Sequence, residues 1–350
     1  MLNEVKLAAY RMLKGEHVAL PEGNRAFVFL AADYGNIGDI AITIAQEKFL
    51  RDRCGYDHVI TVPISKTLRM IDSIRKQIGR NDLVTVIGGG NMGRLYPDIE
   101  RLRRLVVTTF PDNRIVCFPQ SVDTLSSQSS AAEAKAFFRP YAAHRDLYMF
   151  AREPKTYETL SGFGLQEQVD LQLVPDVVLS LAPFHIPACS ASDGSVGLIA
   201  LRHDQERLIS TSETNLLETE IDKLGIPIEK TDTHVGGHGL PPALSEQLFG
   251  DKLLQIARAR FLVTDRLHGM ILAYLTNTPC GVVPNANHKV RSTHEHWLAT
   301  SQAIVPIDVE SRSTIEQSLS LLKEAILKPR SCENIVFSEF VKLEEACSLR

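Results

Sequence analysis

Cysteine is scarce in this chain, which has six in 350 residues, and no two of them form a Cys-x-x-Cys pair. They stand at positions 54, 117, 189, 280, 332 and 347. Disulfide frameworks and structural zinc sites depend on closely spaced cysteines, so this spacing argues against both. We therefore expect reduced thiols, as in a cytoplasmic protein.

Long apolar runs are also missing. No run reaches the length of about 18 apolar residues that a membrane-spanning helix needs. The first twenty positions scatter charged side chains and lack the apolar stretch of a signal peptide. These absences predict a cytoplasmic protein, or one bound peripherally at the inner face of the membrane.

Neither sign of charge dominates the chain. Lysine and arginine number 38 against 42 acidic residues, a net charge of −4, which provides no footprint for nucleic-acid binding. One local basic run occurs at Arg94, Arg101, Arg103 and Arg104. We interpret it as a solvated helix face, with contact to an anionic lipid or a diphosphate as the alternative.

What the chain does have is a regular alternation of short apolar segments and helix-like segments. Strands are predicted at residues 27–31, 59–62, 83–87, 115–118, 147–151, 196–201, 226–230, 261–264 and 280–283. Helices are predicted at an N-terminal segment, at about 39–51, 67–78, from 97, and at 131–143, 215–224, 244–259, 289–298, 313–327 and 334–347. Nearly continuous apolar strands separated by helices indicate parallel sheets covered on both faces.

The length of the chain fits two domains, and a Pro- and Ser-rich stretch at 181–193 is a plausible linker. We expect an N-terminal α/β domain at 1–185 and a C-terminal α/β domain at 194–330. A final helix at 331–350 completes the chain. Two Rossmann-like domains facing a cleft resemble the GT-B arrangement of glycosyltransferases.

The most informative motif is the segment 263–269, Val-Thr-Asp-Arg-Leu-His-Gly, where a predicted strand passes into a predicted helix. Such a junction presents backbone N–H groups and the positive end of a helix dipole. Arg266 suits a carboxylate or phosphate, and His268 can move a proton near neutral pH. The pair predicts acid–base chemistry on an anionic substrate, the alternative being a solvated cap and a surface imidazole.

Two further arginines, Arg152 and Arg202, end predicted strands in the two halves of the chain. Each is expected at the carboxyl end of its strand, where it would face the cleft together with Arg266. A single arginine there is usually a surface residue or a salt-bridge partner. Three at equivalent positions favour a binding site.

Glycine marks two loops. Gly35 and Gly38 precede the first long helix, where they allow a tight turn and close approach to a ligand, and Asp39 can cap that helix. The segment 88–91, Gly-Gly-Gly-Asn, ends a buried strand, which favours a ligand-facing loop over a simple turn. Neither motif is a dinucleotide fingerprint or a P-loop.

Histidines at 234 and 238, and at 294 and 296, raise the question of a metal. They do not show the helical His-Glu-x-x-His spacing, so solvent-facing imidazoles are the better interpretation.

Taken in order, these motifs resemble the polysaccharide pyruvyl transferase family. The matching segments are G-N-I-G-D at 35–39, G-G-G-N at 88–91, F-P-Q-S at 118–121, A-R-E at 151–153, P-D at 175–176, D-R-L-H-G at 265–269 and the region of Lys289. The resemblance implies a GT-B-like fold and transfer of a pyruvyl group from phosphoenolpyruvate to two hydroxyls of a sugar, with release of phosphate. It also implies that Arg202, Arg266 and His268 contact phosphoenolpyruvate, with the domain at 1–185 on the acceptor side and the domain at 194–330 on the side of this donor. The connection 285–288 and the loop 234–238 depart from the family pattern.

The resulting hypothesis is a phosphoenolpyruvate-dependent pyruvyl transferase of polysaccharide biosynthesis that requires no metal or other cofactor. Its partners would be phosphoenolpyruvate and a sugar or lipid-linked oligosaccharide, with no nucleic acid. The predicted catalytic residues are His268 and Arg266; the predicted donor-binding residues are these two with Arg152, Arg202 and Lys289; the predicted acceptor-binding residues are Asn36, Asp39, Gly89, Gly90 and Asn91. The alternatives are a nucleotide-sugar-dependent GT-B glycosyltransferase and a non-catalytic carbohydrate-binding protein.

Overall fold

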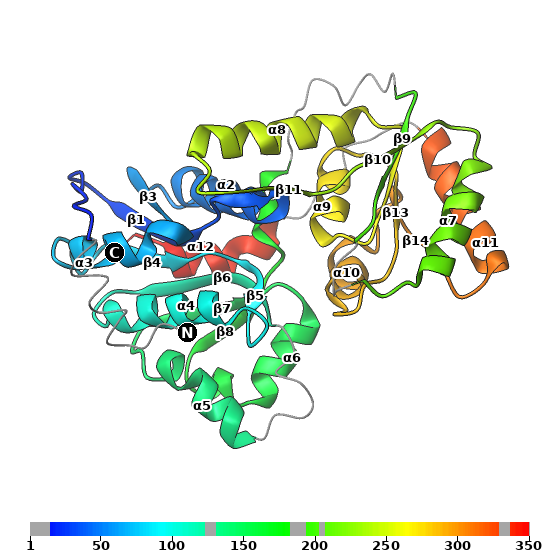
Figure 1. Ribbon diagram of the computed structural model, residues 1–350. Coiled ribbons are helices and arrows are strands. Elements are labelled where there is room, and N and C mark those ends of the chain that lie inside the picture. The colour runs from blue at the N-terminus through cyan, green and yellow to red at the C-terminus, as the bar shows by residue number, and fades with distance from the viewer. Residues whose placement is uncertain (1–14, 123–130, 183–193, 203–206, 329–336, 350) are drawn as a thin grey trace. The chain divides into compact units, whose positions relative to one another are not determined.

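The computed structural model describes residues 15–122, 131–182, 194–202, 207–328 and 337–349, which form two compact units (Figure 1). Unit 1 comprises residues 1–34, 39–180 and 337–350, and unit 2 comprises 35–38 and 181–336. The predicted N-terminal helix and most of the predicted linker lie outside the described residues.

Unit 1 is built on a seven-stranded parallel sheet with the strand order β3-β1-β4-β6-β7-β8 and with β5 paired to β6. The strands are β1 (Arg25–Ala31), β3 (His58–Pro63), β4 (Leu83–Val86), β5 (Gly89–Met92), β6 (Ile115–Val122), β7 (Leu147–Ala151) and β8 (Asp170–Leu173). β1, β4 and most of β6 are buried along their length. Their continuous apolar sequences are therefore those of strands covered on both faces.

Helices cover both faces of this sheet. They are α2 (Ile37–Asp52), α3 (Thr67–Arg75), α4 (Pro97–Thr109), α5 (Ala131–Ala142), α6 (Pro154–Gly162) and α12 (Val341–Cys347), with 3₁₀ turns at Ile64–Lys66, Leu165–Glu167, Val177–Leu181 and Phe337–Phe340. α3, α4 and α5 lie side by side on one face (Figure 1). On the other face the C-terminal segment packs on α2, where the rings of Phe49 and Phe340 are 5.9 Å apart.

Unit 2 is a five-stranded parallel sheet with the order β10-β9-β12-β13-β14. The strands are β9 (Gly197–Ala200), β10 (Ile228–Lys230), β12 (Phe261–Thr264), β13 (Cys280–Val282) and β14 (Ile304–Pro306). The helices are α7 (Thr211–Asp222), α8 (Pro242–Arg258), α9 (Leu267–Leu275), α10 (Lys289–Thr293), a π-helical turn (His294–Leu298) and α11 (Arg312–Leu327). α7 and α11 pack together on one face, and α8, α9 and α10 cover the other (Figure 1).

The α/β class with parallel sheets is confirmed, and most predicted elements are present. Two elements differ because their glycine content hides strands: the expected loop at 88–90 runs into β5, and the expected loop at 234–238 is β11 (His234–His238). β11 pairs with β2 (Tyr34–Asn36) in a separate two-stranded sheet. α6, β8 and β14 were not predicted from the sequence. α7 begins earlier than predicted because Ser210 and Glu213 form a capping box.

No helix among the described residues is both long and apolar enough to cross a membrane.

Candidate functional site

The carboxyl edge of the sheet in unit 2 gathers most of the predicted donor residues. Arg202 follows β9, Asp232 follows β10, Arg266 follows β12 and Asn285 follows β13. These four strands are neighbours and parallel, so their ends meet at one edge, the usual place for ligands in an open α/β sheet.

Asp265 lies at the centre of this edge and is fully buried. Its Oδ1 accepts a hydrogen bond from the backbone N–H of Arg202 at 2.9 Å, and Oδ2 has no hydrogen-bond partner within the described residues. Burial raises the pKa of the Asp265 carboxyl to about 6, opposed by that N–H and by the positive charges of Arg266 and Arg202. The carboxylate therefore holds the backbone of Arg202 and lies within electrostatic range of both arginines.

Arg266 occupies the N-cap position of α9, and its backbone N–H donates to Thr264 Oγ1 at 3.0 Å. Its Nη2 donates to Asp232 at 2.9 Å and 3.0 Å from the two carboxylate oxygens, and the side chain is 12% exposed. Asp232 in turn accepts from the backbone N–H of His234 at 3.1 Å. The guanidinium is thus held in one orientation, as binding of a planar anion requires.

His268 is in the first turn of α9, half-buried, and packs directly on Gly38. A Cβ atom at position 38 would lie 2.2 Å from His268 Nδ1. Gly269 is similarly confined, because its Cβ would lie 2.7 Å from Thr264 Oγ1. The glycines beside His268 are therefore required by packing.

The segment 35–38 belongs to unit 2, and its glycines do not serve a turn. Neither Gly35 nor Gly38 has a positive φ. A Cβ at Gly35 would lie 1.7 Å from Gly236 O, so close approach to β11 explains that residue. Asn36, whose Oδ1 accepts from the N–H of Gly38 at 3.0 Å, caps α2. The expectation that Asp39 caps this helix is wrong, because Asp39 lies within the first helical turn.

Asp39 belongs to unit 1 and accepts a hydrogen bond from the Tyr34 hydroxyl at 3.0 Å. Burial and the Asp39 carboxylate raise the pKa of Tyr34 well above its usual value, so the phenol remains a donor. Gly89, with φ +119°, lies beside this carboxylate, since its Cβ would be 3.6 Å from Asp39 Oδ1. Two of the predicted acceptor residues thus lie together, and Gly90 adjoins them on β5.

Asn91, by contrast, is buried against Arg103. Its side-chain oxygen accepts from Arg103 Nη2, and its backbone oxygen accepts from Nη1 at 3.4 Å. These contacts give Asn91 a role in holding α4 to β5.

Arg103 also corrects the interpretation of the basic run, since it is fully buried and bonded to Glu100 at 2.7 Å. Arg104 pairs with the same carboxylate at 2.9 Å, and Arg101 pairs with Asp98 at 3.2 Å. The solvated helix face that we predicted is wrong for Arg103.

Arg152 is buried within unit 1, with a side chain that is 1% exposed. Its Nε donates to Ser121 Oγ at 2.7 Å and its Nη1 donates to Asp176 Oδ2 at 2.7 Å. The structure therefore brings Arg202 and Arg266 together in unit 2, whereas Arg152 is part of a network in unit 1.

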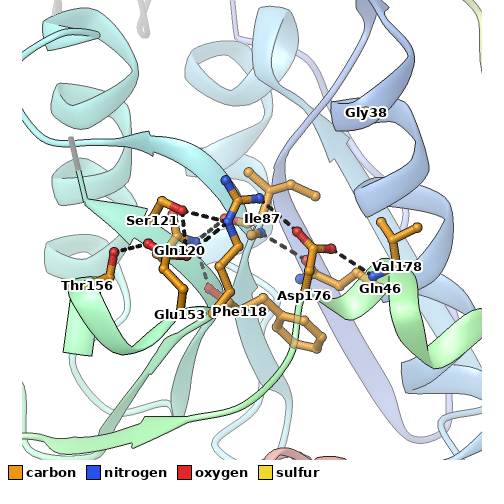
Figure 2. A network of polar contacts seen from close by, with 12 residues as sticks. Gly38, Gln46, Ile87, Phe118, Gln120, Ser121, Glu153, Thr156, Asp176 and Val178 are labelled. Carbon is orange, nitrogen blue, oxygen red and sulfur yellow. Dashed lines mark hydrogen bonds and ion pairs between the residues drawn. The ribbon is translucent and has the colours of Figure 1, made fainter. Parts of the chain in front are cut away.

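That network, shown in Figure 2, joins three of the segments on which the resemblance rests. Ser121 donates to Glu153 Oε2 at 2.8 Å, and Asp176 Oδ1 accepts from the N–H of Val178 at 2.9 Å. Gln120 donates to the backbone oxygens of Ile87 and Phe118 at 2.6 Å and 2.8 Å. The segments 118–121, 151–153 and 175–176 are thus parts of one internal scaffold.

Lys289 and Asn285 lie in the connection that follows β13. Lys289 is half-buried and is the first residue of α10, after His288 with its positive φ of 60°. Asn285 is buried; its Nδ2 donates to Asn287 at 2.7 Å, and its Oδ1 has no hydrogen-bond partner within the described residues.

Sequence reasoning missed Asp232, Asp265 and Asn285. The signal was available, because each follows a predicted strand within a few residues, as Arg202 and Arg266 do.

His234 and His238 are exposed on β11. Within the described residues, no group of three His, Cys, Asp or Glu side chains is placed to hold a metal ion.

Comparison with known protein families shows which family the chain belongs to. A family model described as polysaccharide pyruvyl transferase matches residues 36–287. The chain belongs to the polysaccharide pyruvyl transferase family. The resemblance inferred from the motifs is thereby confirmed.

The chain is also similar to individual proteins, two by sequence and one by fold. General stress protein 30 of Bacillus subtilis is 30% identical over 309 residues, which cover 87% of each chain. Pyruvyl transferase 1 of Schizosaccharomyces pombe is 28% identical over 309 residues, covering 83% of this chain and 74% of the relative. A functionally uncharacterized protein from Klebsiella pneumoniae aligns with a TM-score of 0.54 at 16% identity, over 87% of this chain and 96% of its own, which shows a shared fold.

Proposed function

We propose that this protein transfers a pyruvyl group from phosphoenolpyruvate to two hydroxyls of a sugar during polysaccharide biosynthesis, forming a cyclic ketal and releasing phosphate. Membership of the family supports a transferase of this kind. The observation that carries the choice of donor is the pair Arg202 and Arg266 at the ends of neighbouring strands, both close to the buried Asp265, with His268 in the first turn of α9.

Phosphoenolpyruvate presents a carboxylate and a phosphate, and both need cations with directional N–H groups. In this proposal Arg202 and Arg266 bind the donor, and Lys289 adds a third positive charge. Asp232 holds one corner of the Arg266 guanidinium, which orients the planar group before the donor arrives. Such preorganisation strengthens the binding of charge that develops as phosphate leaves.

His268 is the proposed proton donor. As imidazolium it gives a proton to the methylene carbon of phosphoenolpyruvate, and the central carbon becomes an oxocarbenium-like centre. One sugar hydroxyl adds to that carbon and gives its proton to the neutral His268 imidazole, which restores the imidazolium. The second hydroxyl then displaces phosphate, which takes the remaining hydroxyl proton. No other cofactor is needed to balance these steps.

The acceptor is assigned to Asp39, Gly89 and Gly90 of unit 1. Among the other residues predicted for ligands, Asn36, Asn91 and Arg152 have internal hydrogen-bond roles, and we assign them to the scaffold. The acceptor would be a free sugar or a lipid-linked oligosaccharide. The proposed location is the cytoplasm, with peripheral contact at the membrane for a lipid-linked acceptor.

Phosphate release tests this function. The purified protein is incubated with phosphoenolpyruvate and a panel of sugar acceptors, and the ketal is identified by mass spectrometry. Arg202→Lys and Arg266→Lys should each raise the KM for phosphoenolpyruvate and lower turnover, because a point charge lacks the planar fork. Turnover of a nucleotide-sugar, with no phosphate released from phosphoenolpyruvate, would contradict the proposal.

A further inference from the structure

Gly38 leaves space for the imidazole of His268, although the two residues are far apart in the sequence. A Cβ atom at position 38 would lie 2.2 Å from Nδ1 and 2.6 Å from Cγ of the ring. Gly38 lies in helix α2 and does not have a positive φ. Its own conformation therefore does not require glycine, whereas the neighbouring ring does.

The backbone of the segment 35–38 is held in place by contacts other than the one between Gly38 and His268. The N–H of Ile37 donates to the backbone oxygen of Thr233 at 2.8 Å. β2 pairs with β11, and Gly35 approaches Gly236 so closely that a Cβ would overlap its oxygen (Figure 1). The segment 35–38 thus has a fixed position beside His268.

The loop that begins at Asp232 also contacts Arg266, which caps α9. Asp232 bonds Arg266 at 2.9 Å, and Thr233, its neighbour, bonds the segment 35–38. Residues 232–238 and 35–38 are thus two segments that are hydrogen-bonded to each other, one in contact with Arg266 and the other with His268.

We infer that Gly38 is a positioning residue: the segment 35–38 fixes the orientation of the His268 imidazole. The catalytic meaning of this inference rests on the proposed function, in which His268 protonates the donor. Proton transfer tolerates little misplacement, and a shift of about 1 Å can cost roughly a hundredfold in rate. The Gly-Asn-Ile-Gly segment then belongs to the donor machinery and not to acceptor recognition.

Gly38→Ala tests this inference with two measurements. The His268 ring C–H resonance, identified among the 11 histidines by its loss in His268→Gln, should shift while other histidine resonances stay in place. The kcat should fall tenfold or more, roughly as a displaced proton donor predicts, and the KM for phosphoenolpyruvate should change less. Gly250→Ala on α8, where a Cβ meets nothing within 4 Å, is the matched control and should change neither.

A double-variant cycle separates positioning from general damage. In a His268→Gly background the ring is gone together with the Cβ atom that the new methyl group would meet at 3.0 Å, so Gly38→Ala should cause no further loss of turnover. If Gly38→Ala fails to fold alone, folding of the double variant supports the clash with the ring. Equal losses in both backgrounds, or an unmoved His268 resonance, overturn the inference. If the wild type releases no phosphate from phosphoenolpyruvate, the proposed function fails, while the resonance still decides whether Gly38 positions the ring.

Discussion

Asp265 is a buried carboxyl between two arginines, and its charge affects stability and binding in opposite directions. Burial raises its pKa from 3.8 to about 6, so the folded protein holds this proton more tightly than the unfolded chain does. The stability that comes from the neutral form is present below the unfolded value and is lost as the pH rises through the folded value. The ionised form is the one that attracts Arg202 and Arg266.

We therefore predict that Asp265→Asn makes the free energy of unfolding less dependent on pH. Between about pH 4 and pH 7 the titration of this group should lower the free energy of unfolding of the wild type by on the order of 2 kcal/mol. The variant should not show this decrease. Urea unfolding at several pH values measures the difference. Donor binding at neutral pH should weaken in the same variant, because the backbone of Arg202 loses its anionic acceptor. Parallel pH dependences in the two proteins would contradict this account.

His268 is expected to supply the proton. His268→Gln keeps a polar side chain but cannot act as a general acid, so turnover should fall roughly a hundredfold or more. The affinity for phosphoenolpyruvate, measured by calorimetry, should change less. If the variant keeps most of its turnover, another group donates the proton, and His234 and His238 are the next candidates.

At the scale of elements, the pairing of β2 with β11 depends on a backbone approach that no side chain permits. In Gly35→Ala the new Cβ would lie 1.7 Å from Gly236 O, and backbone cannot rotate away as a side chain can. We predict a loss of stability of about 1–3 kcal/mol and faster amide exchange in β11 and at Ile37, measured by mass spectrometry. Gly162→Ala, which meets nothing within 4 Å, should leave this exchange unchanged. Normal protection of β11 in Gly35→Ala would show that the pairing does not depend on this glycine.

The elements that sequence predicts well are those whose pattern is local. β1 and β12 are continuous apolar runs, and their burial on both faces follows from that pattern alone. β5 and β11 are different, because glycine has low strand propensity and becomes a strand only when a partner is beside it. For β11 the partner is β2, which lies far earlier in the sequence, so no local pattern reveals the pairing.

At the scale of the whole molecule, the candidate site was predictable where position in the chain determines position in the sheet. Arg202 and Arg266 end neighbouring parallel strands, so the strand pattern was enough to bring them together. Arg152 also ends a strand, yet its contacts are set by Ser121 and Asp176, which come from distant segments. The strand pattern predicts where in the sheet a residue lies, but not which groups its side chain contacts.

Arg152 is either a donor-binding residue or a member of the buried network, and the two interpretations predict different results for Arg152→Leu. The guanidinium neutralises buried Asp176 and bonds Ser121, so Arg152→Leu would leave the carboxylates of Asp176 and Glu153 without it. Removing one partner of a buried ion pair typically costs about 3–5 kcal/mol, so chemical denaturation should show a large loss of stability. The KM for phosphoenolpyruvate, measured at low temperature on the folded fraction, should stay near that of the wild type.

Arg101→Ala is the matched control, since Arg101 pairs with an exposed Asp98 and should change the stability by less than about 1 kcal/mol. The opposite result for Arg152→Leu, with stability preserved and donor binding weakened, would return Arg152 to the donor site. It would also mean that the network in Figure 2 opens when the donor binds, because a fully bonded guanidinium cannot reach a ligand without breaking its bonds to Ser121 and Asp176.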